Sequence, residues 1–181
     1  RVGDPLQRED ELAGKTLLLI GFGAIGQRIA TLARAFEMTV IAIRRQPTAD
    51  TGAAHAVHGP AALHRLLPTA DIVLLCCPLT PETDRLIDAR ALAAMKPSAY
   101  LINVARGRVV DESALIEALA KRRIAGAGLD CFVDEPLPAT SPWWSMDHVI
   151  VTPHAAGETR WIEQRLMALL VENLNRLWRG D

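Results

Sequence analysis

Three polar residues have the side chains that the reduction of a carbonyl group requires, and each follows an apolar run. They are Arg106, Glu135 and His154. A histidine can donate a proton to a carbonyl oxygen as negative charge develops there. A carboxylate bound to its other ring nitrogen would fix the tautomer and favour the imidazolium. An arginine can hold a substrate carboxylate and polarise the adjacent carbonyl. These residue types predict a site that reduces a carbonyl beside a carboxylate.

Each of these residues also has an ordinary explanation. An arginine before a glycine is usually a surface charge, an acidic pair before a proline is typical of a solvated turn, and a histidine after a proline is usually a loop residue. The chemical interpretation gains weight because all three follow late strands of the predicted sheet. The carboxyl ends of such strands form the edge at which ligands bind.

A glycine-rich segment at 21–26 lies between an apolar run at 16–20 and a helical stretch that reaches about residue 36. In this setting its spacing is typical of a dinucleotide-binding turn, whose helix N-terminus offers free N–H groups to phosphates. Its first glycine allows the tight turn, its second lets the backbone approach a pyrophosphate, and its third lets helix and strand pack closely. The residues predicted to contact the cofactor here are Gly21, Gly23, Ala24, Ile25 and Gly26. The alternative is a glycine-rich turn without a ligand.

The second apolar run, at 38–43, ends at Arg44 and Arg45. NAD-binding versions of this motif carry an acidic residue at this point, which accepts the ribose hydroxyls. An acid would repel a 2′-phosphate, whereas guanidinium groups pair with it in a bidentate manner. The sequence therefore predicts NADP as the cofactor in preference to NAD. The alternative is that both arginines are solvated charges after a strand.

The elements that must position these residues are apolar, β-branched runs that alternate with helical stretches rich in Ala, Leu and Arg. We predict strands at 16–20, 39–43, 71–76, 100–104, 127–131 and 149–152, with a further short strand at 54–57. We predict helices at 25–36, 61–67, 88–95 and 113–121, and one long C-terminal helix at 158–178. Strands that alternate with helices predict an α/β fold with a doubly wound parallel sheet of the Rossmann type.

The overall composition argues against several classes of binding partner. Its 181 residues carry 20 basic and 21 acidic side chains, a formal net charge of −1, which argues against a nucleic-acid binder. No apolar run approaches the roughly 20 residues that a membrane span needs. Three cysteines suggest neither a disulfide framework nor a zinc site, and His55, His58 and His64 lack a carboxylate or cysteine partner for a metal. We expect no metal, no nucleic-acid or membrane partner, and a reduced cytoplasmic compartment.

Five motifs in order give the chain a resemblance to the D-isomer-specific 2-hydroxyacid dehydrogenases over essentially its whole length. The motifs lie at 21–26, 77–83, 103–107, 130–136 and 152–157. The resemblance implies that Arg106, Glu135 and His154 hold the catalytic positions and that Asp130 contacts the nicotinamide carboxamide. The further residues that it places along the cofactor groove are Cys77, Pro78, Val104, His154 and Gly157.

The sequence departs from the usual family pattern in two respects. Arg44 and Arg45 replace the acid after the second strand, as in NADP-using members such as glyoxylate/hydroxypyruvate reductases. We also expect the family's substrate domain, which is normally built from both ends of the chain, to be missing from this segment. We therefore expect a linker at 1–14, a dinucleotide-binding domain at 15–157, and at 158–181 a long helix that leads toward the absent substrate domain.

The resemblance implies an oxidoreductase that transfers a hydride between NADPH and a small 2-keto acid or D-2-hydroxy acid, with glyoxylate or hydroxypyruvate as the type of substrate. It also implies a homodimer formed through the nucleotide-binding domain. We expect this segment alone to bind cofactor and to be inactive or weakly active. The alternative is a non-catalytic, cofactor-sensing protein of the same fold, because some relatives act as transcriptional corepressors. NADPH turnover with glyoxylate discriminates between the two.

Overall fold

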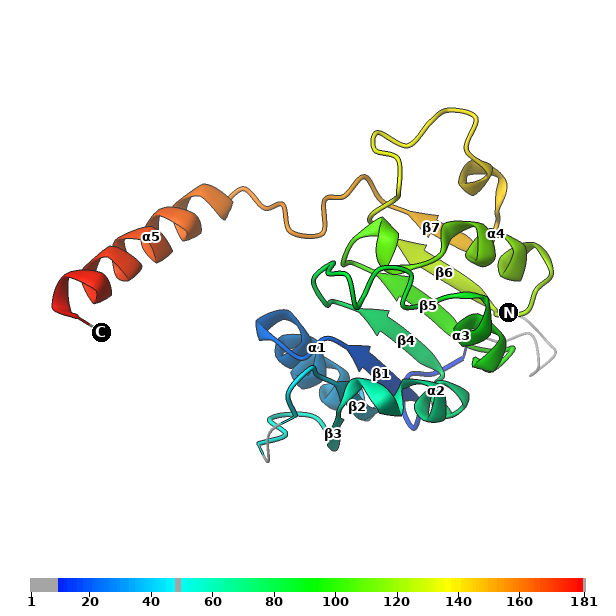
Figure 1. Ribbon diagram of the computed structural model, residues 1–181, viewed down its shortest axis with the longest axis horizontal. Coiled ribbons are helices and arrows are strands. Elements are labelled where there is room, and N and C mark those ends of the chain that lie inside the picture. The colour runs from blue at the N-terminus through cyan, green and yellow to red at the C-terminus, as the bar shows by residue number, and fades with distance from the viewer. Residues whose placement is uncertain (1–9, 48–49, 181) are drawn as a thin grey trace, which may run out of the picture.

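Seven parallel strands form one sheet in the order β3-β2-β1-β4-β5-β6-β7 (Figure 1). The computed structural model describes residues 10–47 and 50–180, so most of the predicted linker at 1–14 lies outside the described residues. The strands are β1 (Thr16–Ile20), β2 (Thr39–Ile43), β3 (Ala56–His58), β4 (Ile72–Leu75), β5 (Tyr100–Asn103), β6 (Gly126–Leu129) and β7 (Val149–Val151). The prediction of a doubly wound parallel sheet is confirmed.

Helices cover both faces of this sheet. The covering helices are α1 (Ala24–Ala35), α2 (Leu63–Leu66), α3 (Ala89–Ala94) and α4 (Glu112–Ala120). A further helix, α5 (Ile162–Arg179), lies at the end of the chain and does not cover the sheet. Leu17 and Leu19 of β1 pack on the side of α1, whereas Leu18 and Ile20 pack on the opposite side with α2, α3 and α4. Because β1 is buried on both faces, its sequence is an unbroken apolar run.

The order of the strands reverses beside β1. The chain continues from β1 to β2 on one side, and it returns to add β4 on the other side of β1. In sheets of this kind ligands bind in the crevice beyond the carboxyl ends of the strands at the reversal. The glycine-rich segment at 21–26 directly follows β1, so the fold places it at this crevice.

The second predicted helix, at 61–67, is shorter and less regular than expected. Its α-helical part is α2, which lies between two 3-10 turns, η2 (Pro60–Ala62) and η3 (Leu67–Thr69). Pro68 lies within η3 and has no N–H group, so it cannot continue the α-helical hydrogen bonds.

The short strand predicted at 54–57 forms slightly later, as β3. The side chain of His55 gives the reason, because its Nδ1 accepts the Val40 N–H at 3.0 Å. That N–H is then not available for a backbone hydrogen bond, and regular pairing with β2 begins at Ala56.

The long C-terminal helix begins at Ile162 rather than at residue 158. The N–H of Trp161 bonds to the Thr159 hydroxyl at 3.2 Å, and the N–H of Ile162 bonds to the Thr159 carbonyl at 3.0 Å. This local turn competes with the helix and delays its start. The helix ends at Arg179, where Gly180 adopts the left-handed conformation (φ 78°) that favours glycine as a cap.

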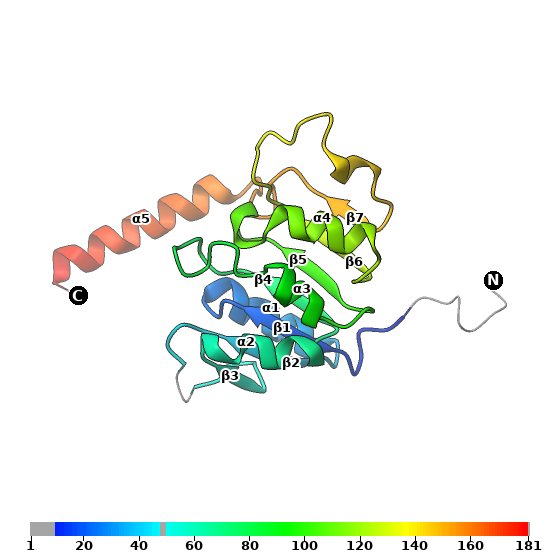
Figure 2. The same ribbon diagram turned by 45° about the vertical axis from the view of Figure 1, so that its right-hand side comes forward.

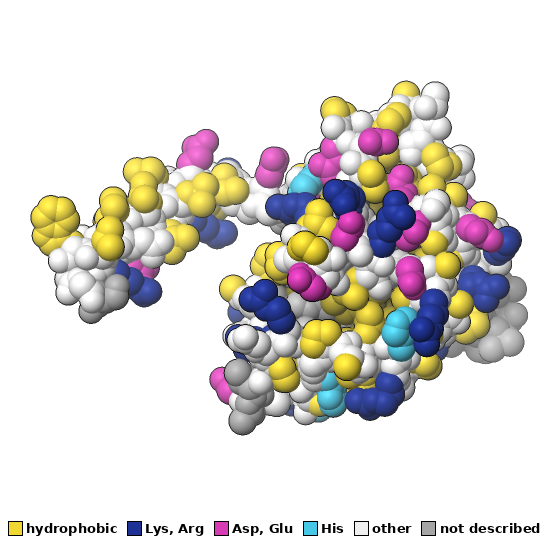
Figure 3. Space-filling model, viewed as in Figure 1, with side chains coloured by type: hydrophobic (Ala, Val, Ile, Leu, Met, Phe, Trp, Pro, Cys, Tyr) yellow, Lys and Arg dark blue, Asp and Glu magenta, His cyan; other side chains and the backbone are white. Residues whose placement is uncertain are grey.

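Helix α5 projects away from the sheet and its helices (Figures 1 and 2). None of its residues is buried, and hydrophobic side chains lie along it in the space-filling view (Figure 3). Trp178, near its end, is 93% exposed. Helices that are this apolar normally pack against another element. Among the described residues, no helix combines the length and apolar character needed to cross a membrane.

Candidate active site

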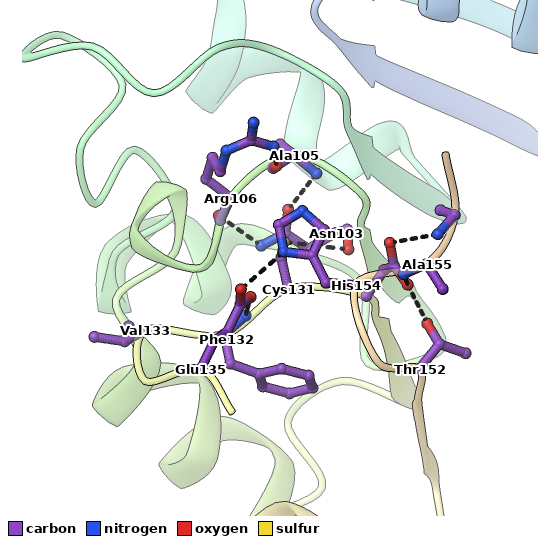
Figure 4. Close-up of polar contacts among 12 residues, drawn as sticks. Asn103, Ala105, Arg106, Cys131, Phe132, Val133, Glu135, Thr152, His154 and Ala155 are labelled. Carbon is purple, nitrogen blue, oxygen red and sulfur yellow. Dashed lines mark hydrogen bonds and ion pairs between the residues drawn. The ribbon is translucent and has the colours of Figure 1, made fainter. Parts of the chain in front are cut away.

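His154 and Glu135 form a hydrogen-bonded pair at the carboxyl edge of the sheet (Figure 4). His154 follows β7 and Glu135 follows β6, which are adjacent parallel strands, so residues 19 apart in sequence meet. His154 Nδ1 lies 2.8 Å from Glu135 Oε2, and Glu135 Oε1 accepts the Phe132 N–H at 2.8 Å. The hydrogen bond from His154 holds the pKa of Glu135 below its usual range, helped by the Phe132 N–H and by the positive charge of Arg106. This arrangement fixes one ring nitrogen and leaves the other free for a ligand.

Asp130 holds the loop that carries His154. Its Oδ1 accepts the Thr152 hydroxyl at 2.6 Å and the Ala155 N–H at 3.0 Å, and its Oδ2 accepts the Ala156 N–H at 2.9 Å. Burial alone would raise the Asp130 pKa, but these three hydrogen bonds and the nearby His154 lower it overall. The residues that donate these hydrogen bonds lie before and after His154 in the sequence. The bonds therefore hold the backbone of His154 at φ 55°, a conformation that is uncommon for a non-glycine residue.

The contacts of Asp130 add to the role expected for it. The resemblance implies that Asp130 contacts the nicotinamide carboxamide, and that contact stays a prediction. Each carboxylate oxygen can accept two hydrogen bonds, so Oδ2, which accepts only the Ala156 N–H within the described residues, keeps capacity for a ligand.

Arg106 follows β5, the strand that pairs with β6, and its side chain is exposed. Its Nη1 donates to the Ala105 carbonyl at 2.6 Å, and within the described residues no carboxylate pairs with its guanidinium. Gly107 packs tightly on the loop after β6, because a Cβ placed on it would lie 2.1 Å from the carbonyl carbon of Phe132. The three predicted catalytic residues therefore come from the ends of β5, β6 and β7, which are neighbours in the sheet.

The three glycines of the segment at 21–26 have different surroundings. Gly21 has φ 105°, and a Cβ on it would lie 2.6 Å from Cys77 N, while a Cβ on Gly26 would lie 2.4 Å from the Gly21 carbonyl oxygen. Close backbone contact therefore excludes a side chain at both positions. A Cβ on Gly23 would have no described atom within 4 Å, so the space above it is open.

The start of α1 can receive an anion. Gly23 is the residue before the helix, and no described side chain accepts a hydrogen bond from the first turn. Ala24 and Ile25 are exposed there, Ile25 to 60%. Uncapped N–H groups at the positive end of a helix dipole bind phosphate oxygens readily.

Arg44 and Arg45 follow β2 at the same edge of the sheet. Arg44 is half-buried and Arg45 is exposed, and neither guanidinium has a hydrogen bond or ion pair to another described residue. Glu82 lies in the loop after β4. Its pKa is lowered mainly by the hydrogen bond from the Thr80 hydroxyl, and the positive charge of Arg45 lowers it further. Arg45 therefore lies within electrostatic reach of the loop after β4, on the other side of β1.

The other predicted groove residues lie after β4, β5 and β7. Cys77 is buried, Pro78 and Gly157 are exposed, and Val104 is half-buried. Burial raises the pKa of Cys77 and raises the pKa of its neighbour Cys76 to about 12. Both thiols therefore stay protonated and act as packing groups at neutral pH. Across the described part of the chain, no three His, Cys, Asp or Glu side chains gather as a metal site would need.

Sequence reasoning missed one polar residue of the site, Asn103. Its side chain is 1% exposed and bonds to the backbone of the loop that carries Arg106. The signal in the sequence was a polar residue at the end of an otherwise apolar run, because a buried amide needs hydrogen-bond partners close by.

Comparison with known proteins identifies the family. A family profile described as "D-isomer specific 2-hydroxyacid dehydrogenase, NAD binding domain" matches residues 3–156. The chain belongs to this family. It is 41% identical over 175 residues to a glyoxylate reductase of Pyrococcus furiosus, and the aligned region covers 94% of this chain and 50% of the relative. It is 43% identical over 166 residues to an (S)-sulfolactate dehydrogenase of Chromohalobacter salexigens, covering 92% and 54%. The chain thus spans about half the length of the curated relatives it matches.

Two solved structures are similar in fold. A D-isomer specific 2-hydroxyacid dehydrogenase from Xanthobacter autotrophicus Py2, in complex with NADPH, matches with a TM-score of 0.84 and 41% identity, covering 92% of this chain and 68% of that one. An NADPH-dependent glyoxylate/hydroxypyruvate reductase from Sinorhizobium meliloti, in complex with NADP, matches with a TM-score of 0.86 and 28% identity, covering 96% and 55%. The chain is therefore a dinucleotide-binding domain of this dehydrogenase family.

Proposed function

We propose that this chain is the nucleotide-binding part of an NADPH-dependent reductase that converts a small 2-keto acid, of the glyoxylate or hydroxypyruvate type, to a D-2-hydroxy acid. The observation that carries the proposal is the His154–Glu135 pair, held at 2.8 Å at the edge of the sheet that also carries the glycine-rich segment. A histidine that a carboxylate orients beside a dinucleotide groove is suited to move a proton during reduction.

The features of the β1–α1 turn support the binding of a dinucleotide. Gly21 and Gly26 are required by backbone packing, whereas the space above Gly23 and the uncapped N-terminus of α1 are open for a pyrophosphate. The residues that would line the rest of the groove are Cys77, Pro78, Val104, Asp130 and Gly157. When bound, NADPH supplies the hydride.

Preference for NADP is supported by Arg44 and Arg45. Neither guanidinium forms a hydrogen bond or ion pair with a carboxylate of the described residues, and no acidic side chain follows β2 directly to repel a 2′-phosphate. The NADPH and NADP complexes of the Xanthobacter and Sinorhizobium relatives support the same choice.

The side chains of the site divide the work on the substrate. Arg106 would bind the carboxylate of the 2-keto acid and polarise its carbonyl group. His154 would hold a proton on Nε2 and donate it to the carbonyl oxygen as that oxygen gains negative charge. Glu135 accepts a hydrogen bond from Nδ1, which would keep the ring in place and leave Nε2 available to the substrate.

A turnover assay tests the proposal. The longer protein that contains this chain is mixed with NADPH and glyoxylate, and the loss of NADPH absorbance is followed. We expect glyoxylate-dependent oxidation of NADPH, and we expect the isolated 181-residue chain to bind NADPH with little turnover. If NADPH binds but none of the small 2-keto acids tested is reduced, the proposal is wrong and a cofactor-sensing role is favoured.

A further inference from the structure

Asn103 is the last residue of β5 and its side chain is 1% exposed. Strand β5 is an interior strand of the sheet, and Asn103 pairs with Leu75 of β4 on one side and with Leu129 of β6 on the other. A buried amide that lacked partners would cost about 1–3 kcal/mol, so its hydrogen bonds indicate what holds it there.

Both ends of the Asn103 amide bond to the loop that follows it (Figure 4). Its Oδ1 accepts the Ala105 N–H at 3.0 Å, and its Nδ2 donates to the Arg106 carbonyl oxygen at 3.0 Å. The amide therefore bridges the start and the end of the Ala105–Arg106 step. It fixes the backbone of Arg106 directly.

The backbone of Asn103 joins this loop to the loops of the other site residues. Its carbonyl oxygen accepts the Asp130 N–H at 3.0 Å, and the Asp130 side chain in turn holds the loop around His154. On the far side of Arg106, Gly107 packs against the backbone of Phe132. Arg106 is thus held from both neighbouring positions in the chain, while its own guanidinium bonds only to the Ala105 carbonyl within the described residues.

We propose that Asn103 is a positioning residue that sets where Arg106 presents its guanidinium to the substrate carboxylate. A long side chain on an exposed loop would otherwise sample many positions, and a displacement of about 1 Å can cost roughly 100-fold in rate. The proposal rests on the substrate-binding role proposed above for Arg106. It assigns to Asn103 no contact with the substrate itself.

A double-mutant cycle in the longer enzyme tests the proposal. Asn103→Ala should lower kcat/KM for glyoxylate by roughly 10- to 100-fold in the parent, through a higher KM and a lower kcat. In an Arg106→Ala background the same change should have an effect of less than about two-fold, because the group that it positions is gone. The dissociation constant for NADPH should stay within about two-fold of the parent in every variant.

Asn103→Asp gives a second measurement that keeps the size of the side chain. One oxygen can still accept the Ala105 N–H, but an ionised carboxylate places its other oxygen against the Arg106 carbonyl oxygen. Protonation restores a donor at that position. The kcat/KM of this variant, divided by that of the parent, should therefore rise as the pH is lowered.

Asp88→Ala is the matched control for general loss of stability. It removes one side-chain hydrogen bond to the backbone, from the Ala91 N–H at 2.8 Å, and it has no hydrogen bond to the loop at 103–107. We expect a lower melting temperature and an unchanged kcat/KM.

The outcomes separate the two proposals. If Asn103→Ala lowers kcat/KM by the same factor with and without Arg106, or if NADPH binding weakens equally, Asn103 is a structural residue and the inference is wrong. A pH-independent ratio for Asn103→Asp also counts against it. If Arg106→Ala alone leaves kcat/KM unchanged, the proposed role of Arg106 fails, and this inference fails with it.

Discussion

The Glu135 carboxylate accepts two hydrogen bonds, one from His154 Nδ1 and one from the Phe132 N–H. These two hydrogen bonds underlie the chemistry proposed for the site. Because these donors lower the Glu135 pKa, its carboxylate stays charged from neutral pH down to acidic pH. The stabilisation is present above the ordinary pKa of a glutamate and is lost as the pH falls through the lowered value. In the neutral range Glu135 is therefore a carboxylate, and its hydrogen bond fixes the orientation of the His154 ring.

Glu135→Gln keeps the size of the side chain and removes its charge. Loss of the carboxylate removes the interaction that stabilises a protonated imidazole, so the His154 ring should lose its proton more readily. As the pH is raised, the rate of reduction should therefore decline at a lower pH than in the parent. The dependence of kcat/KM on pH, measured in the longer enzyme with glyoxylate, checks this.

Glu112→Gln is the control for the Glu135 variant. Glu112 is a nearby carboxylate that accepts the Val133 N–H at 3.2 Å and has no hydrogen bond to His154. Its pH profile should match that of the parent. A Glu135→Gln profile superimposable on the parent would remove Glu135 from the mechanism.

Arg44 and Arg45 lead to a prediction about cofactor choice. Arg44→Asp combined with Arg45→Ala should weaken NADPH binding by roughly 2–4 kcal/mol, because each arginine contributes a charge-assisted contact to the 2′-phosphate. Titration of this chain with NADPH and with NADH measures the effect. Arg34→Ala, at the opposite end of α1, is the control and should change neither affinity. Equal affinity of the unmutated chain for NAD and NADP cofactors would contradict the prediction.

At the level of secondary-structure elements, the turn between β1 and α1 combines packing with ligand binding. Gly26→Ala would place a Cβ 2.4 Å from the Gly21 carbonyl oxygen, so helix and strand would have to separate. We expect a loss of about 1–3 kcal/mol in the free energy of unfolding, measured by urea denaturation of this chain, together with weaker NADPH binding.

Gly23→Ala is the matched variant for this turn. A Cβ there meets no described atom within 4 Å, so stability should fall by less than about 1 kcal/mol, the cost of a poorer helix cap. NADPH binding should still weaken, because the added methyl group occupies space proposed for the pyrophosphate. Unchanged NADPH affinity in Gly23→Ala would show that the ligand does not lie there.

The sequence predicts the sheet well because its strands are apolar runs with glycine or polar residues at their ends. It also predicts that His154 and Glu135 lie at one edge, since the ends of successive parallel strands meet there. It does not predict the hydrogen bonds of Asn103 and Asp130, which depend on the path of loops within a few residues. The broken helix around Pro68 and the late start of α5 after Thr159 likewise depend on local hydrogen bonds that compete with the helix.

At the level of the whole molecule, α5 carries apolar residues without a covering element in the described chain. Leu166, Leu170 and Leu174 are each at least half exposed. Exposed apolar surface of this extent usually marks an interface. We propose a homodimer with two-fold symmetry through the nucleotide-binding domain, as the family resemblance implies.

Sedimentation of this chain at micromolar concentration tests the dimer. We expect the mass of a dimer for the parent. Leu170→Glu with Leu174→Glu should reduce it to a monomer if α5 takes part in the interface. A monomeric parent would contradict the dimer and would mean that α5 packs against a different partner.

The proposed division of labour in the site is tested by the turnover of His154→Ala in the longer enzyme, compared with the affinity of this variant for NADPH. We propose that His154 donates the proton while the glycine-rich turn and the arginines bind the cofactor. We predict that kcat for glyoxylate reduction falls roughly 10²- to 10⁴-fold, while the dissociation constant for NADPH stays within about two-fold of the parent. A kcat within about two-fold of the parent would show that His154 does not donate the proton.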